Sequence, residues 1–332
     1  SCHLPSPLHG LLLIDPHYLL ETLKLMLSSE SAGKSTIPSS ERWLSPTVVH
    51  FISGGIAGCI AKSFIAPFDR VKILSQTNNK HYPYTGIFST IRTIYQKEGL
   101  AKLWTGNGAT VIRIAPYAAI QFMTYEKAKQ VIIGKDTKHS NWTPLLHMIC
   151  GSIAGTVSTA VTYPLDLLRA RLASQVMERR YRNTFHGMTL MCHEEGFRSL
   201  WKGMVPTLQG IIPYAGVNFA VFETLKYYCP KNEKDEISPV YKLICGGIAG
   251  AMGQTVSYPW DVVRRRRQTA GFAAGVPEFE YRGSWRTMVT IARTEGLAAL
   301  YRGISINFWK VTPAVSISFT VYDYLKSWLS TI

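Results

Sequence analysis

The chain has 332 residues, a formal net charge of +15 and 46% hydrophobic residues. This length suits two ordinary domains or one assembly of repeats, and the mean composition is that of a soluble protein. A large positive charge is typical of nucleic-acid-binding proteins, but no such motif occurs, so we expect no nucleic acid as a partner. The six cysteines and nine histidines lack metal-ligand spacing, and no nucleophile–base or phosphate-loop arrangement stands out. We therefore expect no metal, no cofactor and no enzymatic activity.

Residues 1–45 form an N-terminal extension that we expect to be disordered or weakly structured. Its apolar stretch at 8–13 is too short to span a membrane. Acidic residues such as Asp15, Glu21 and Glu30 make it a poor match to an arginine-rich presequence.

A repeated signature organises the rest of the chain. The pattern Pro-x-Asp-x-x-Lys/Arg begins at Pro67, Pro164 and Pro259, which are 97 and 95 residues apart. A Glu-Gly pair follows in each copy, and the acid of an aromatic-acid-x-x-Lys string lies 28 residues after the glutamate of that pair. A fixed long period indicates copies of one structural unit. We therefore predict three repeats, at residues 46–140, 141–236 and 237–332.

Each repeat is predicted to contain a long helix, a basic loop, a short amphipathic helix and a second long helix. In the first repeat, the first long helix runs from Pro46 to Gln76 and is bent at Pro67, because proline removes a hydrogen bond and clashes with the preceding turn. The short helix covers about 88–97, where apolar residues recur at helical spacing. The second long helix covers about 104–130.

Six stretches of about 20 residues carry at most one charged residue each, as membrane-spanning helices do. They cover residues 46–66, 106–124, 141–163, 203–222, 237–258 and 303–321. Two spans per repeat return the chain to its starting side, so both termini are expected in one compartment. We predict an all-α membrane protein with six kinked transmembrane helices in three-fold pseudosymmetry; the alternative is a soluble protein with six buried helices.

Two sets of charged residues are expected at opposite ends of the long helices. The set after the prolines, called here the first charge ring, comprises Asp69, Lys72, Asp166, Arg169, Asp261 and Arg264. The set in the aromatic-acid-x-x-Lys strings, the second charge ring, comprises Glu126, Lys129, Glu223, Lys226, Asp323 and Lys326. Around a three-fold axis, each acid can reach a base of the neighbouring repeat; independent pairs three residues apart are the alternative. Two rings at the two ends of one cavity predict two gates that open alternately.

Three isolated cations lie deep inside the predicted spans, namely Lys62, Arg113 and Lys310, and no Asp or Glu occurs in the same stretches. Lys242, in the span 237–258, is expected at the membrane interface. Ionisable groups at membrane depth are costly and usually functional. A cation without an acidic neighbour is best satisfied by an anionic ligand, so we expect these residues to bind an anionic substrate. For Lys62 and Lys310, snorkelling or solvation by water is the alternative.

These triple motifs resemble those of the mitochondrial carrier family over residues 46–330, which is the whole chain except the extension. The resemblance implies a barrel of six kinked helices, three short amphipathic helices on the matrix side and a multi-pass location in the mitochondrial inner membrane. Both termini would face the intermembrane space, and we expect a monomer.

The same resemblance implies how each ring pairs. The matrix gate would contain the pairs Asp69–Arg169, Asp166–Arg264 and Asp261–Lys72. The cytoplasmic gate would contain the pairs Glu126–Lys226, Glu223–Lys326 and Asp323–Lys129.

The resemblance also implies roles for residues beside the gates. Gln76 and Gln268 would be glutamine braces of the matrix gate, and Tyr125 and Tyr322 would brace the cytoplasmic gate. Cardiolipin would bind at helix N-termini, where free N–H groups favour phosphate. The glycines of these sites would be Gly106, Gly203 and Gly303.

For the substrate, the resemblance places Arg113, the pair Gly210 and Ile211, and Lys310 at three contact points. A Gly-Ile pair at the second point is typical of carriers of adenine-containing substrates, and the sequences that begin at Arg113, Ile212 and Tyr258 are similar to those of coenzyme A carriers. The implied function is import of coenzyme A in exchange for an adenine nucleotide such as ADP. Another adenine-nucleotide carrier (for ADP, ATP or AMP) and a non-transporting membrane adaptor with the same fold are the alternatives.

Overall fold

The computed structural model describes residues 46–79, 81–133, 143–176, 180–230, 238–272 and 283–330, and these residues contain helices and no strands. The N-terminal extension lies outside the described residues. Six helices are long: α2 (Pro46–Gln76), α4 (Asn107–Ile132), α5 (Thr143–Ser174), α7 (Met204–Tyr228), α8 (Pro239–Thr269) and α10 (Ile304–Ser330). Three are short: α3 (Ile87–Glu98), α6 (Thr184–Glu195) and α9 (Ser284–Glu295).

A short 3₁₀ turn follows each short helix, namely η2 (Leu100–Trp104), η3 (Phe197–Trp201) and η5 (Leu297–Tyr301). The prediction that the second long helix begins near residue 104 was therefore wrong by three residues. Gly106 interrupts the helix there because it takes a left-handed φ of 89°, which glycine adopts without steric cost.

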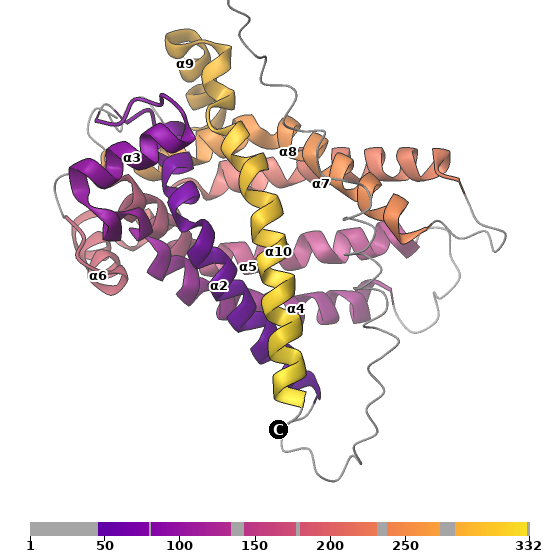
Figure 1. Cartoon of the computed structure of the whole chain (residues 1–332). Coiled ribbons are helices and arrows are strands. Elements are labelled where there is room, and N and C mark those ends of the chain that lie inside the picture. The colour runs from indigo at the N-terminus through magenta and orange to yellow at the C-terminus, as the bar shows by residue number, and fades with distance from the viewer. Residues whose placement is uncertain are drawn as a thin grey trace, which may run out of the picture.

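The six long helices form a closed ring. Each contacts the next in the order α2, α4, α5, α7, α8 and α10, and α10 packs against α2. The helices α2, α5 and α8 also touch one another. Figure 1 shows the short helices gathered at one end of the molecule, while the far ends of α4, α7 and α10 spread apart. The predicted all-α fold with three-fold pseudosymmetry is confirmed.

Each long helix contains an internal proline, and the six are Pro67, Pro116, Pro164, Pro213, Pro259 and Pro313. A proline inside a helix removes one hydrogen bond and pushes the chain away from a straight axis. The spans can therefore converge at one end of the ring and separate at the other.

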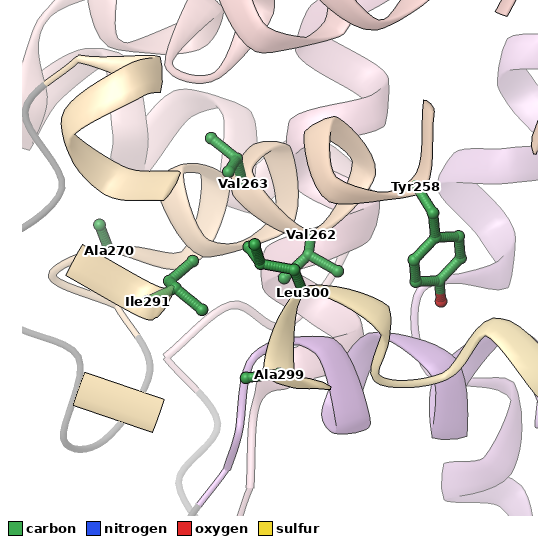
Figure 2. Close-up of a cluster of buried hydrophobic side chains, with 7 residues drawn as sticks. All are labelled: Tyr258, Val262, Val263, Ala270, Ile291, Ala299 and Leu300. Carbon is green, nitrogen blue, oxygen red and sulfur yellow. The ribbon is translucent and has the colours of Figure 1, made fainter. Parts of the chain in front are cut away.

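A buried apolar cluster holds each short helix against the first long helix of its repeat. In the third repeat Ile291 of α9 is fully buried with Val262 and Val263 of α8 and with Leu300 of η5 (Figure 2). Burying one such side chain contributes roughly 1.5–3 kcal/mol. The short helices are thus fixed to the same end of the ring as the first charge ring.

The outer surface of the ring is apolar. In α2 the large side chains Ile56, Ile60 and Phe64 are exposed and lie four residues apart, on one helical face. Such a stripe suits contact with lipid chains. Within the part of the chain that the structure describes, length and mean hydropathy alone identify two helical segments as apolar enough to cross a membrane, Leu146–Ser174 and Phe197–Tyr228. The other spans are supported by the closed ring and the charge distribution.

Candidate functional site: a basic cavity between two charge rings

The first charge ring is closed. Its inter-repeat ion pairs are Arg169 with Asp69, Arg264 with Asp166 (2.5 Å) and Lys72 with Asp261 (3.8 Å). Each pair joins two different helices among α2, α5 and α8, as expected from the repeat spacing. The Lys72–Asp261 pair is the longest, and its carboxylate is the most exposed of the three, at 37%. The helices that begin the three repeats are therefore tied together at their kinks.

The two glutamines beside this ring make different contacts. Gln268 Nε2 donates to Asp166 Oδ2 at 2.8 Å and to the Tyr163 hydroxyl at 2.9 Å. Gln76 Nε2 donates at 3.1 Å to the hydroxyl of Tyr258, not to a ring carboxylate. Gln268 therefore braces a ring pair directly, whereas Gln76 acts only through a tyrosine.

Each short helix ends in a glutamate that binds a buried arginine of the same repeat. The pairs are Arg70 with Glu98, Arg171 with Glu195 and Arg266 with Glu295. Burial alone would raise the pKa of Glu195, but hydrogen bonds from Arg171 and Lys202 hold this pKa at about 2. The glutamate stays ionised at neutral pH, which keeps the short helix attached to the first long helix.

The second charge ring is open. Lys226 lies 3.4 Å from Glu223 of its own helix, and both side chains are more than 40% exposed. Among the described residues, no ion pair joins members of this ring from different helices. The inter-repeat pairs predicted there are not formed in this structure, because the ends of α4, α7 and α10 lie apart (Figure 1).

The tyrosines expected to brace the second charge ring bind histidines instead. The Tyr125 hydroxyl lies 2.8 Å from His147 Nδ1 of α5. The Tyr322 hydroxyl lies 2.6 Å from His50 Nδ1 of α2. In this open arrangement, each tyrosine is held against the neighbouring long helix.

A cavity of about 580 Å³ lies between the two rings, with walls from α4, α5, α7 and α8. It brings together three of the predicted contact residues, Arg113, Gly210 and Ile211. Lys62 and Lys310 do not line it. The volume lies within the roughly 300–1,000 Å³ typical of small-molecule sites.

The prediction that the isolated cations lack acidic partners was wrong for two of them. Arg113 Nη1 lies 2.8 Å from Asp166 Oδ1, and Lys310 Nζ lies 2.7 Å from Asp69 Oδ1. Each carboxylate comes from a neighbouring repeat, so inspection of the span that holds the cation does not reveal it. Lys62 has no carboxylate within ion-pair distance in the described part of the chain.

Positive charge nevertheless exceeds negative charge in the cavity, whose lining contains four arginines and two aspartates. Asp166 alone meets three guanidinium groups, those of Arg113, Arg264 and Arg265 (3.5 Å). One carboxylate cannot neutralise three guanidinium groups, and this imbalance favours an anionic ligand.

Sequence reasoning missed Arg265, because only the residue three positions after each acid was assigned to the first charge ring. The basic run at 264–267 lies inside α8, where successive side chains point about 100° apart. Arg264 and Arg265 face Asp166, while Arg266 pairs with Glu295. The signal available in the sequence was the distance of Arg265 from Pro259, which is six residues and so less than two helical turns.

Two tyrosines of the cavity wall also escaped prediction. Tyr117 and Tyr214 line the cavity, each four residues after a predicted contact residue. The Arg113 guanidinium lies 5.1 Å from the centre of the Tyr117 ring, within cation–π range. Gly210 lies against Trp260 of α8, whose Cβ would be 3.1 Å from a Cβ added at Gly210.

The three glycines proposed for cardiolipin immediately precede the second long helix of each repeat. A separate cavity of about 350 Å³ adjoins Gly106, and basic residues Lys102 and Arg182 belong to its lining. Gly203 is packed tightly: a Cβ there would be 2.8 Å from the Tyr163 hydroxyl. At Gly303 the corresponding distance, to the Tyr258 hydroxyl, is 3.2 Å.

Comparison with known proteins shows similarity along nearly the whole chain. The family model described as mitochondrial carrier protein matches three times, at residues 44–136, 140–233 and 235–332. The chain is 45% identical to mitochondrial substrate carrier family protein P of Dictyostelium discoideum, covering 86% of this chain and 95% of the relative. It is 42% identical to solute carrier family 25 member 16 of Homo sapiens (83% and 86%) and 37% identical to mitochondrial carrier protein CoAc2 of Zea mays (90% and 91%).

Proposed function

The chain belongs to the mitochondrial carrier family, and we propose that it imports coenzyme A into the mitochondrial matrix in exchange for an adenine nucleotide. The observation that carries this proposal is the positive surplus around Asp166. Coenzyme A is an adenine nucleotide with several phosphate charges, and such a ligand supplies the missing negative charge.

Arg113 would bind phosphate in competition with Asp166. Its side chain is 21% exposed and lines the cavity, so an entering phosphate can reach it. Lys310 pairs with Asp69 as Arg113 pairs with Asp166, so a phosphate would compete for it in the same way. Lys62 interacts electrostatically with both Asp69 and Lys310. A phosphate that draws Arg113 and Lys310 away from Asp166 and Asp69 would remove ion pairs from two carboxylates of the first charge ring. The closed ring would then be less stable.

The adenine ring would bind at Gly210 and Ile211. Both residues line the cavity, and Trp260 of α8 packs against Gly210. Tyr214 lies one helical turn further on the same wall and offers an aromatic face for stacking. The apolar and basic groups would then lie on different parts of the wall, as a nucleotide requires.

Alternating access would require the first charge ring to open while the second charge ring closes. With the first ring closed and the second open, the cavity is reached from the side opposite the short helices. Substrate-induced opening of the first ring, with closure of Glu126, Glu223 and Asp323 onto lysines of neighbouring repeats, would deliver the ligand to the other side. In the inner membrane, the short helices would face the matrix, the chain would act as a monomer, and cardiolipin would bind near Gly106, Gly203 and Gly303.

Binding is tested by thermal unfolding of the purified protein with coenzyme A, dephospho-coenzyme A, ADP, ATP or phosphate. A ligand at 100 times its Kd stabilises a folded protein by about 2.7 kcal/mol, so coenzyme A should raise the unfolding temperature measurably. Arg113→Gln should lose this response. Lys226→Gln, which removes a charge outside the cavity, is the matched control and should keep it.

The two alternatives give different results in the same experiment. Stabilisation by ADP and ATP without any response to coenzyme A would assign the protein to other adenine nucleotides. No response to any anion would favour the non-transporting adaptor.

A further inference from the structure

The helices α7 and α8 lie close together along their length. A Cβ added at Gly253 of α8 would be 3.0 Å from the Tyr214 carbonyl oxygen of α7. Two turns nearer the open end, Gly246 lies beside the ring of Phe222, 4.0 Å from such a Cβ. Small residues on α8 therefore allow the backbone of α7 to approach, and the two helices stay in contact toward the second charge ring.

Beyond these contacts, two thiols meet. Cys229 follows the last residue of α7, and its Sγ lies 3.3 Å from Sγ of Cys245 on α8. Cys245 is 5% exposed, whereas Cys229 is partly exposed. A disulfide has an S–S distance of about 2.05 Å, so the sulfur atoms need to approach by little more than 1 Å.

The helix pair α4 and α5 corresponds to the pair α7 and α8 in the next repeat. Two cysteines meet between α7 and α8, but the corresponding positions of α4 and α5 do not hold two cysteines. Cys150 lies 14 residues before Pro164, as Cys245 does before Pro259. The residue that corresponds to Cys229 there is Ile132, so Cys150 has no thiol opposite it. The cysteine pair is therefore not required for helix packing in this fold.

We propose that Cys229 and Cys245 form a reversible disulfide that fastens the end of α7 to α8 and holds the second charge ring open. Lys226 lies one turn before Cys229 and must leave its present position to reach Glu126 of α4. A covalent link at Cys229 keeps this end of α7 against α8. Closure of the second ring, and with it the transport cycle, is then prevented until the link is reduced.

The oxidant is a low-molecular-weight disulfide, and the chemistry is thiol–disulfide exchange. The more exposed Cys229 thiolate attacks one sulfur of the oxidant, forms a mixed disulfide and releases one thiolate. The Cys245 thiolate then attacks Sγ of Cys229, forms the internal disulfide and releases the second thiolate. The two protons lost by the cysteines end on the two released thiols, so the oxidant is reduced as the protein is oxidised.

The hydrogen bond between the two thiols raises the pKa of Cys229. The thiolate is the attacking form, so the reaction should become faster as the pH rises above neutral.

The test treats the full-length protein in liposomes with oxidised glutathione and maps cysteine-containing peptides by mass spectrometry without reduction. We expect a linked peptide containing Cys229 and Cys245, while Cys150 stays a free thiol. Nucleotide exchange should fall at least tenfold and recover on reduction with dithiothreitol. Cys229→Ser should exchange normally and resist the oxidant, and Cys150→Ser should behave as the wild type does.

Two results would overturn the inference: both thiols remaining free after treatment, or a linked peptide in protein whose exchange rate is unchanged. The exchange measurement rests on the proposed function, whereas the peptide map does not depend on transport. Failure of the proposed function and failure of the disulfide therefore give different results.

Discussion

Replacement of Asp166 by Asn tests whether the first charge ring holds this state together. The carboxylate is 2% exposed and contacts Arg113, Arg264 and Arg265. Asparagine keeps the shape of the side chain but removes the negative charge that these three guanidinium groups share. Lys226→Ala is the control at the other end, because the ion pair of Lys226 among the described residues is an exposed one within its own helix.

The two substitutions should differ widely in cost. Removing one partner of a buried ion pair costs about 3–5 kcal/mol, whereas an exposed pair within a helix contributes about 0.3–0.5 kcal/mol. With a shift of about 2–4 °C in unfolding temperature per kcal/mol, Asp166→Asn should lower that temperature by roughly 10 °C and Lys226→Ala by roughly 1 °C.

The assay is thermal unfolding of the purified variants, followed by tryptophan fluorescence in one detergent and without substrate. Equal shifts for Asp166→Asn and Lys226→Ala would refute the assignment of a closed first ring and an open second ring.

Three further substitutions test the binding site and the packing of the helices. Lys310→Ala should abolish nucleotide exchange in liposomes while the protein still inserts and folds; exchange at the wild-type rate would remove Lys310 from the binding site. Gly203→Ala should lower the unfolding temperature, because Gly203 has a φ of 93° and a Cβ would lie 2.8 Å from the Tyr163 hydroxyl, whereas Gly216→Ala has no heavy atom within 4 Å and should not destabilise. Glu195→Gln should destabilise at pH 7. Because the pKa of Glu195 is lowered from 4.5 to about 2, the wild type should lose this advantage as the pH falls from about 4.5 toward 2, and a gap that persists at pH 2 would contradict the assignment.

The architecture could be predicted because its signals are repeated and local. Pro67 and its two counterparts fix the period, and α2 begins and ends at the predicted residues Pro46 and Gln76. The start of α4 was missed because the position at which a left-handed glycine such as Gly106 interrupts a helix depends on packing. Such a glycine looks in sequence like any other glycine in an apolar stretch.

The electrostatics of the site could be predicted only in part. Pseudosymmetry places the acids and bases of the first ring near one another, but the partner of Arg113 depends on which neighbouring helix faces it. The state of the second ring was not predictable, because the same six charges fit an open or a closed arrangement. Contact between Cys229 and Cys245 likewise depends on how α7 and α8 turn toward each other.

The most direct test of the account is uptake of labelled coenzyme A by liposomes that contain the protein and are loaded with ADP. We predict saturable uptake that requires internal ADP, is inhibited by external adenine nucleotides and is lost in Arg113→Gln. Rapid ADP or ATP exchange in the same vesicles with no uptake of coenzyme A would contradict the proposed substrate.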